Sequence, residues 1–265
     1  MNQLIKKISK ISIIIGIILS CVMTVVEIVQ LLEDGGLIEL GGSNSANSSI
    51  SGVVTDAELK EVIAMSDEDV WKSLTGGLLT DRPADKNPSN ASDIKSAVEK
   101  QIVDITVPIR AWDKASDESN MKIVKKEVTI PVNSLLSKLW QAFFEDLYQN
   151  APDFVIVEVG GFRIDGTGYG QIGFKSGHTY GAAVDINASD NSYGGTLYSK
   201  SEWSKMSDSH KKHQIIYQDS EVVKIAHKYT LYWGGEWNQS TKDIMHFSFV
   251  CDGKTRAERL QMYGN

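Results

Sequence analysis

Two histidines and an aspartate in the C-terminal half of the chain have the types and spacing of a metal site. His178 lies in the segment SGHTYGAAVD, which ends at Asp185, and His246 opens the apolar run HFSFV. The glycine-bearing turn after His178 can fold its imidazole back beside the carboxylate, and His246 would come from a neighbouring strand. A catalytic zinc site needs three nitrogen or oxygen ligands and an open position for water. We therefore predict a Zn2+ ion held by His178, Asp185 and His246.

Two further residues are predicted to act beside this metal. A bound zinc lowers the pKa of its water toward neutrality and polarises a carbonyl, and a second carboxylate must then move the water's proton to the leaving amine. Asp243 stands three residues before His246, and a tight turn between them would aim its carboxylate at the metal. Arg163 follows a predicted buried strand, where a guanidinium can stabilise an oxyanion or pair with a substrate carboxylate. We predict Asp243 and Arg163 as catalytic residues.

Each of these residues also has a purely structural interpretation. A lone histidine such as His178 more often belongs to a hydrogen-bonded core, and Arg163 or Asp243 can be an ordinary ion-pair partner at the surface. The metal interpretation is favoured because Asp185 sits between two apolar residues, where an unpaired carboxylate is destabilising. His246, in a second strand-like segment, supplies the partner that such a site requires.

The other residues with ligand-type side chains are not predicted to bind metal. Lysines flank the pair His210 and His213, which is typical of a solvated helix face, and His227 lies near the end of a predicted helix. Two cysteines, Cys21 and Cys251, cannot build a disulfide scaffold or a cysteine-rich zinc module. The net charge of −7 gives no support to a surface that tracks nucleic-acid phosphates, so no nucleic-acid partner is expected.

The elements predicted around these residues describe an α+β domain over residues 101–265. The predicted strands are 101–112, 122–130, 153–159, 183–187, 230–233 and 246–250, and the predicted helices are 135–149 and 221–229. Hairpins and helices follow one another without the alternation of parallel βαβ units. We therefore expect a small antiparallel sheet with flanking helices.

The chain before residue 101 is predicted to hold a membrane anchor, a linker and a spacer. Residues 1–34 contain an uncharged apolar run with lysines before it and acidic residues after it, which predicts a cytoplasmic tip and a single transmembrane helix. A cleaved signal peptide and a lipoprotein signal at Cys21 are the alternatives. Residues 35–54 are rich in Gly, Ser and Asn and form a predicted flexible linker. Residues 55–100 form a predicted spacer of short helices, with a loop at 77–94.

Two motifs resemble a known family of zinc peptidases. The segment SGHTYGAAVD is similar to the S-x-H-x-x-G-x-A-x-D signature of VanY-type D-Ala-D-Ala carboxypeptidases and the related L-Ala-D-Glu peptidases. The segment WGGEWNQSTKDIMHFSF is similar to their W-G-G-x-W…D-x-x-H-F pattern. The resemblance covers roughly residues 107–249 and implies the fold shared with the hedgehog signalling domain. It implies zinc ligands at His178, Asp185 and His246, a general base at Asp243 and a transition-state arginine at Arg163.

The resemblance also indicates where a substrate would bind. It implies a hydroxyl beside the metal or the substrate at Ser176, and a stem peptide of peptidoglycan as the substrate. The aromatic residues Tyr180, Trp233 and Trp237 fit either a core or a platform for substrate. We assign Ser176, Tyr180, Trp233 and Trp237 to substrate binding.

The predicted function is therefore a zinc peptidase that cuts peptidoglycan stem peptides outside the cell membrane, of the D-alanyl-D-alanine carboxypeptidase type. An L-alanyl-D-glutamate endopeptidase is the first alternative, and a non-catalytic, zinc-containing wall-binding module is an alternative of another class. Ser248 stands where many members of the family carry glutamate, and residues 166–173 are richer in glycine than the family pattern. Both departures concern specificity rather than the metal.

Overall fold

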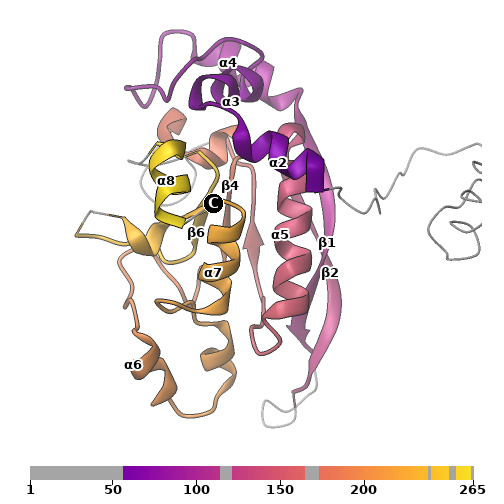
Figure 1. The fold of residues 1–265 in the computed structure, drawn as a ribbon, viewed down its shortest axis with the longest axis vertical. Coiled ribbons are helices and arrows are strands. Elements are labelled where there is room, and N and C mark those ends of the chain that lie inside the picture. Colours follow the sequence, from indigo (N-terminus) through magenta and orange to yellow (C-terminus); the bar gives the residue numbers. More distant parts are fainter. Residues whose placement is uncertain (1–55, 114–120, 165–172, 238–239, 251–254, 264–265) are drawn as a thin grey trace, which may run out of the picture. The chain divides into compact units, whose positions relative to one another are not determined.

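The computed structural model describes residues 56–113, 121–164, 173–237, 240–250 and 255–263 (Figure 1). The chain divides into two units, Met1–Ser48 and Ser49–Asn265, and every described residue belongs to the second. Within the described ranges, no helix is both long enough and apolar enough to cross a membrane. The predicted anchor (1–34) and linker (35–54) lie outside the described residues.

A long antiparallel hairpin forms one side of the domain (Figure 1). Strands β1 (Ile102–Trp112) and β2 (Ile123–Asn133) pair along their whole length. Along the C-terminal half of β1, buried residues alternate with more exposed ones, because successive side chains of a strand point to opposite faces. Helix α5 (Ser137–Asn150) packs against β1. The predicted strands 101–112 and 122–130 are confirmed, and the second extends to Asn133.

A second sheet carries the predicted metal ligands. Its four antiparallel strands lie in the order β3-β4-β6-β5. Their bounds are β3 (Val159–Gly160), β4 (Ala183–Ile186), β5 (Tyr232–Trp233) and β6 (His246–Ser248). Phe143 of α5 contacts Phe247 of β6, with ring centroids 5.9 Å apart, so the sheet rests on the same aromatic core as the hairpin. Two antiparallel sheets with flanking helices confirm the predicted α+β class.

The prediction of a buried strand over residues 153–159 is wrong. Only Val159 of this stretch lies in a strand, although the side chains of Val155 and Ile156 are buried as expected. The backbone amides of the stretch bond to three separate parts of the chain: Val155 to His213 O, Ile156 to Arg110 O, and Val157 to Asn187 Oδ1. Partners scattered in this way cannot form one ladder, so the segment buries Val155 and Ile156 without being a strand.

Three helices precede the hairpin and cover one end of the domain (Figure 1). They are α2 (Asp56–Ala64), α3 (Asp67–Leu74) and α4 (Ala91–Glu99). Short helices were predicted within residues 55–100, but α4 begins inside the predicted loop 77–94. Their buried apolar side chains belong to the same core as α5 and the hairpin: Val70, Leu74, Ile94 and Val98. This segment therefore packs on the domain as part of it.

Three helices lie toward the C-terminus. Helix α7 (Glu221–Lys228) confirms the predicted helix and packs against α5. Helices α6 (Lys200–Ser204) and α8 (Arg256–Tyr263) were not predicted, because α6 is barely one turn long and α8 is largely polar. The fully buried Arg259 holds α8 in place by donating to the carbonyl oxygen of Thr230 at 3.0 Å.

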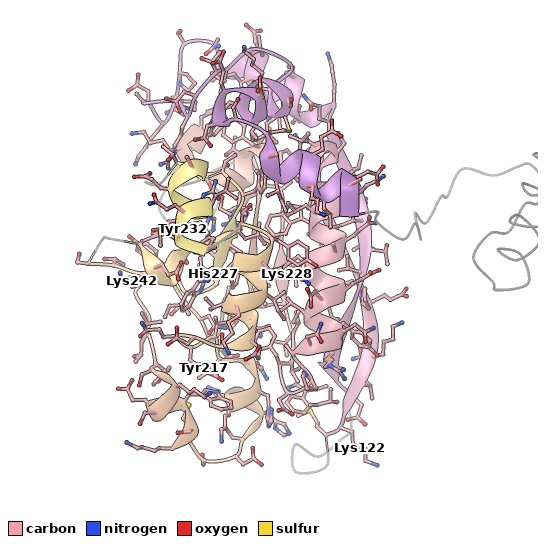
Figure 2. The ribbon with its side chains drawn as sticks, viewed as in Figure 1. Lys122, Tyr217, His227, Lys228, Tyr232 and Lys242 are labelled. Atoms are coloured by element: carbon pink, nitrogen blue, oxygen red, sulfur yellow. The ribbon has the colours of Figure 1, made fainter. Side chains whose placement is uncertain are left out.

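A buried aspartate joins α5 to α7. Asp146 accepts hydrogen bonds from Lys228 at 2.5 Å, Asn150 at 2.6 Å and Tyr229 at 3.1 Å. Lys228 lies between the two helices (Figure 2). Burial opposes ionisation of Asp146, but the bonds from Lys228 and its neighbours outweigh it and lower the pKa below the usual 3.8. The carboxylate is thus a charged tie between two helices.

The substitution Asp146→Asn is expected to lower the free energy of unfolding by about 1–2 kcal/mol at pH 7, because it removes a charged acceptor of buried hydrogen bonds. The folded-state pKa lies below the unfolded value, so the carboxylate's contribution is full above about pH 5 and is lost as the pH falls through the folded pKa. Urea unfolding measured from pH 7 to pH 2.5 should show that the stability difference between the wild type and Asp146→Asn narrows below about pH 4.

Glu145→Gln is the control for this prediction. Glu145 is exposed on the same helix, so its substitution should change stability by less than about 0.5 kcal/mol at any pH. A stability difference between the wild type and Asp146→Asn that stays constant down to pH 2.5 would contradict an ionised Asp146 linking the two helices.

Candidate metal centre

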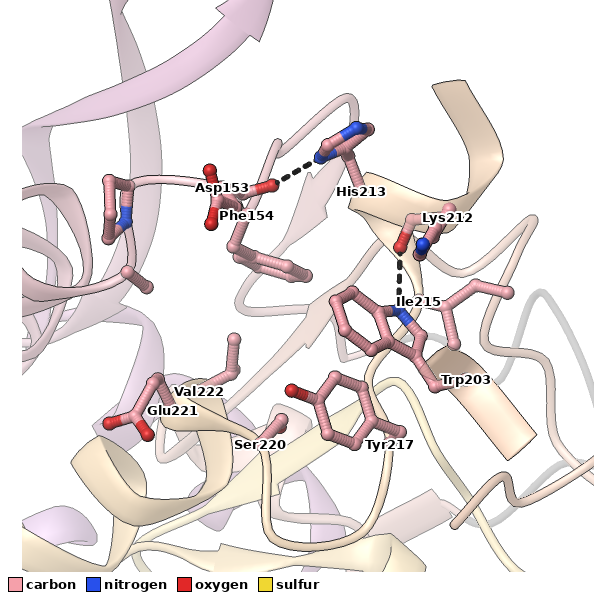
Figure 3. Close-up of a pocket in the computed structure, with 12 residues that line it drawn as sticks. Asp153, Phe154, Trp203, Lys212, His213, Ile215, Tyr217, Ser220, Glu221 and Val222 are labelled. Carbon is pink, nitrogen blue, oxygen red and sulfur yellow. Dashed lines mark hydrogen bonds between the residues drawn. The ribbon is translucent and has the colours of Figure 1, made fainter. Parts of the chain in front are cut away.

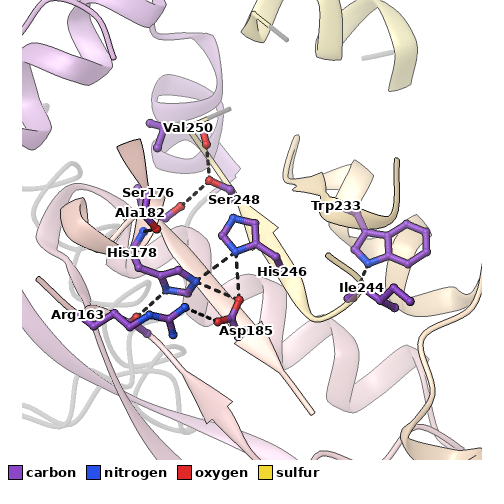
Figure 4. A network of polar contacts seen from close by, with 11 residues as sticks. Arg163, Ser176, His178, Ala182, Asp185, Trp233, Ile244, His246, Ser248 and Val250 are labelled. Atoms are coloured by element: carbon purple, nitrogen blue, oxygen red, sulfur yellow. Dashed lines mark hydrogen bonds and ion pairs between the residues drawn. The ribbon is translucent and has the colours of Figure 1, made fainter. Parts of the chain in front are cut away.

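Strand pairing places two of the three predicted ligands side by side. Asp185 of β4 lies directly opposite His246 of β6, so their side chains share one face of the sheet. Asp185 Oδ1 lies 3.1 Å from His246 Nδ1 (Figure 4). On the other edge of β4, Gly160 of β3 lies opposite Asp185. The register of the sheet therefore fixes the geometry of this pair.

The third predicted ligand comes from a turn rather than a strand. His178 lies in a 3-10 turn, η4 (Gly177–Tyr180), and the Ser176 hydroxyl caps this turn by accepting from the His178 amide at 3.3 Å. Gly181 ends the turn with φ +63°, and a Cβ there would lie 2.5 Å from the backbone nitrogen of Asn133. Only glycine fits this left-handed, crowded position. The turn then leads directly into β4, so the spacing from His178 to Asp185 is set by local backbone geometry.

The ring of His178 has a defined tautomer. Its Nδ1 lies 2.8 Å from the carbonyl oxygen of Gly161, which can only accept a hydrogen bond. Nδ1 therefore carries the proton and the lone pair of Nε2 faces Asp185 and His246. A backbone carbonyl that orients an imidazole in this way is a common support for a metal ligand.

Three donor atoms converge in a nearly equilateral triangle. His178 Nε2 lies 3.0 Å from Asp185 Oδ1 and 3.2 Å from His246 Nδ1, and the third side is 3.1 Å (Figure 4). Ligands of one tetrahedral zinc lie about 3.3 Å apart, because each is about 2.0–2.1 Å from the ion. Among the described residues, these three are the one group of three or more histidine, cysteine or acidic side chains whose ligand atoms come together. The donor set and its spacing fit a zinc site.

The protonation states of the cluster suit a metal. Burial lowers the pKa of His178, although the Asp185 carboxylate partly offsets this effect. Burial also opposes ionisation of Asp185, but its electrostatic interactions with His178 and His246 hold its pKa well below the usual range. A neutral imidazole and an ionised carboxylate are the forms that bind a divalent cation.

Arg163 lies against the predicted ligands. Its Nη2 donates to Asp185 Oδ2 at 2.8 Å, and its backbone amide donates to the carbonyl oxygen of His178 at 3.2 Å. Its side chain is 48% exposed, whereas that of Asp185 is 6% exposed. The guanidinium thus connects the buried cluster to solvent.

Asp243 is buried in the turn that leads into β6. Its carbonyl oxygen accepts from the His246 amide at 3.2 Å, which is the tight turn that the sequence prediction requires. Its own amide donates to the carbonyl oxygen of Gly234, and a Cβ on Gly234 would lie 2.2 Å from Asp243 O. The glycine of the WGGEW motif therefore lets the two backbones approach. Asp243 is not one of the three converging side chains, and its role as a base stays a prediction.

The residues predicted to bind substrate fall into different environments. Tyr180 is fully buried, and its hydroxyl donates to the Phe174 carbonyl at 2.8 Å. Trp233 is also interior, and its Nε1 donates to the Ile244 carbonyl at 2.7 Å. Both side chains serve the core, so the geometry does not support their predicted contact with substrate. Their motif position alone could not reveal this burial.

Trp237 and Ser176 lie closer to the metal cluster. The Trp237 ring centroid is 5.6 Å from that of His246, so this aromatic side chain forms part of the wall beside a predicted ligand. The Ser176 hydroxyl supports the backbone of His178. A role in substrate binding stays a prediction for both residues.

Sequence reasoning missed the carbonyl oxygen of Gly161 as a partner of the metal cluster. A Cβ on Gly161 would lie 2.3 Å from the carbonyl oxygen of Pro131, so the chain comes very close to β2 at this point. The only sequence signal is the glycine pair that follows an apolar run. Ser248, where many family members carry glutamate, directs its hydroxyl to the carbonyl oxygens of Ala182 and Val250 (Figure 4).

A separate pocket of about 100 Å³ lies where the chain beyond α5 meets the start of α7 (Figure 3). Its lining contains none of the predicted site residues. The stacked rings of Trp203 and Tyr217, 4.5 Å apart, form one wall, and Trp203 Nε1 donates to the Lys212 carbonyl. The lining includes both cationic and acidic side chains and indicates no particular ligand.

Comparison with protein families agrees with the geometry. Residues 170–249 match the model of a family described as D-alanyl-D-alanine carboxypeptidase, a VanY-like peptidase family. Neither the comparison with curated proteins nor that with solved structures gives a match. The matched segment contains all three converging ligands and Asp243, while Arg163 precedes it. The resemblance predicted from the two motifs is confirmed, and the match indicates a hydrolase of the peptidase class.

The turn between the first two ligands should tolerate no side chain at Gly181. The substitution Gly181→Ala combines a left-handed φ with a clash against Asn133, and should destabilise the fold by more than about 2 kcal/mol. Gly77→Ala is the matched control, because Gly77 has φ +88° but no atom within 4 Å of its would-be Cβ. The control should lose only about 1–2 kcal/mol of stability, which is the cost of placing an alanine in a left-handed backbone conformation. Thermal unfolding of both variants measures the difference, and equal losses would refute a tightly packed turn.

Proposed function

We propose that this protein is a zinc metallopeptidase that hydrolyses the stem peptides of peptidoglycan, of the D-alanyl-D-alanine carboxypeptidase type. The observation that carries the proposal is the convergence of His178, Asp185 and His246 within 3.0–3.2 Å, inside the segment that matches the peptidase family. The family description favours the carboxypeptidase. The L-alanyl-D-glutamate endopeptidase is the alternative with the same chemistry.

In the proposed mechanism, the chain holds the metal and arranges the groups around it. His178 Nε2, His246 Nδ1 and Asp185 would hold zinc, which when bound supplies a Lewis acid and an acidified water. The Gly161 carbonyl keeps the His178 proton on Nδ1, so that Nε2 is always free to coordinate. All three ligand side chains are buried, so bulk water has little access to them.

Asp243 and Arg163 would act on the substrate. Asp243, fixed by the turn to His246, would accept the proton of the attacking water and deliver it to the leaving amine. Arg163 presents a half-exposed guanidinium beside Asp185. Guanidinium groups pair with carboxylates by two parallel hydrogen bonds, so Arg163 suits a peptide carboxylate next to the cleaved bond, or the oxyanion that forms. A C-terminal D-alanine and a D-glutamate both offer such a carboxylate.

We also propose that the catalytic unit works outside the cytoplasmic membrane, attached by a single N-terminal helix. The support is the apolar run within residues 1–34, with lysines on one side and acidic residues on the other. Peptidoglycan, the proposed partner, lies on that side of the membrane. Secretion after signal cleavage is the alternative, and the negative net charge offers nothing to a nucleic acid.

Metal analysis tests the proposed centre directly. The purified chain should contain close to one zinc ion per molecule, and His178→Ala and His246→Ala should each lose it, because two protein ligands hold zinc far more weakly than three. His210→Ala is the control: this histidine packs on Trp112, away from the cluster, and its substitution should keep the zinc. Zinc retained by either ligand variant would overturn the assignment.

Product analysis tests the reaction. Incubation with purified muropeptides that carry a full stem should release one alanine from the C-terminus, detected by mass spectrometry. A free fragment beginning with L-alanine would support the endopeptidase instead, and zinc binding without any cleavage would indicate a non-catalytic wall-binding module. Asp243→Ala should keep its zinc and lose turnover by at least about 100-fold, since it removes the proposed base. Full activity in this variant would refute the role of Asp243.

A further inference from the structure

The loop that carries His178 is contacted by a segment that lies far from it in the sequence. We name residues 67–90, which comprise α3 and the loop after it, the brace. We name residues 173–181, which comprise the short turns η3 (Gly173–Lys175) and η4 and the final Gly181, the ligand loop. The brace lies outside the segment matched by the peptidase family, residues 170–249. Three independent contacts join the two.

The first contact is a two-pronged hydrogen bond from an arginine. Arg82 donates from Nε at 2.9 Å and from Nη2 at 2.6 Å to the carbonyl oxygen of Lys175. Lys175 immediately precedes Ser176, whose hydroxyl caps the turn that holds His178. Both prongs of a planar guanidinium on one carbonyl fix its direction as well as its distance.

The second contact is between backbones. Phe174 N donates to the carbonyl oxygen of Lys86 at 2.9 Å. A Cβ on Gly173 would lie 2.5 Å from the same oxygen, and Gly173 has φ +57°. The brace therefore approaches the ligand loop so closely that only a glycine fits at this point.

The third contact is aromatic and reaches the far end of the ligand loop. Trp71 of α3 packs edge-on against Tyr180, with ring centroids 4.9 Å apart. The Tyr180 hydroxyl ties back to the Phe174 carbonyl. The brace thus holds both ends of the ligand loop.

The three ligands differ in how much support they need. Asp185 and His246 are fixed by the pairing of β4 with β6. His178 lies in a short 3-10 turn, whose hydrogen-bond geometry is poorer than that of a strand or an α-helix. A ligand on such a turn keeps its position only if outside contacts hold the turn.

We infer that Arg82 is a positioning residue, and that the brace sets the metal affinity of the centre by fixing the ligand loop around His178. The inference rests on the proposed function only in that the centre binds zinc. It assigns a role to the N-terminal helical segment, which packs on the domain without supplying any of the converging ligands.

The chain offers a matched control for Arg82. Arg110 of β1 makes the same two-pronged bond, from Nε at 3.1 Å and Nη2 at 2.8 Å, to the carbonyl oxygen of Tyr148. That clamp joins β1 to α5 and does not touch the ligand loop. Arg82→Ala and Arg110→Ala therefore remove the same kind of bond, and only the first removes it from the ligand loop.

The test compares zinc affinity across the full-length wild type, Arg82→Ala, Arg82→Lys and Arg110→Ala, by competition with a chelator. Arg82→Ala should weaken zinc binding about tenfold, in the range seen when groups that orient metal ligands are removed. Arg82→Lys should recover part of the loss, because an ammonium still donates to the carbonyl. Arg110→Ala should keep the wild-type zinc affinity, although its melting temperature should fall by about as much as that of Arg82→Ala. Unchanged affinity in Arg82→Ala, or an equal loss in Arg110→Ala, would overturn the inference.

Hydrogen exchange on the metal-free protein separates this inference from the proposed function. Amides of the ligand loop should exchange faster in Arg82→Ala, or in Arg82→Lys if the alanine variant does not fold, than in Arg110→Ala. If the wild type binds no zinc while the variants show this exchange pattern, the proposed centre is refuted and the structural role of the brace stands. Equal exchange in the loop for all variants would refute the brace.

Discussion

The pairing of β4 with β6 is the constraint on which the rest of the site depends. It sets a carboxylate opposite an imidazole inside a sheet where every residue of β4 is buried. An ionised Asp185 in that position would be strongly destabilising alone, and His246 and Arg163 supply its hydrogen bonds. The core beneath the sheet, where Phe247 meets Phe143, keeps β6 in register. Fold and site are thus stabilised by the same short strands.

The three predicted ligands are held in position in different ways. Two ligands are held by regular strand pairing, and the third relies on the Gly161 carbonyl, the Ser176 cap and the brace. Part of the WGGEW segment is structural in a similar way. Trp233 bonds to the Ile244 carbonyl, and Gly234 lets the backbone of Asp243 approach. These contacts place Asp243 next to β6 without any regular element of its own.

The sequence predicted most of the elements that carry local periodicity. The hairpin strands, α5 and α7 follow from alternating or helical patterns of apolar residues, which act over a few neighbours. The stretch 153–159 has the composition of a strand but is not one, because Val157 finds its acceptor on the side chain of Asn187. Helix α8 was missed because it has no apolar face. The buried Arg259 donates to the Thr230 carbonyl, and the ring of Tyr263 stacks on His227.

The sequence by itself determined which residues form the centre, since the types and spacing of His178, Asp185 and His246 lie within two short motifs. The tertiary structure decided which neighbours serve it. It assigned Tyr180 and Trp233 to the core, brought Arg163 onto Asp185, and placed Arg82 on a carbonyl 93 positions away. The physical reason is range. The spacing of residues within a motif reflects local backbone geometry. Burial, and contacts such as that of Arg82, depend on the packing of segments far apart in the chain, and this packing produces no periodic pattern in the sequence.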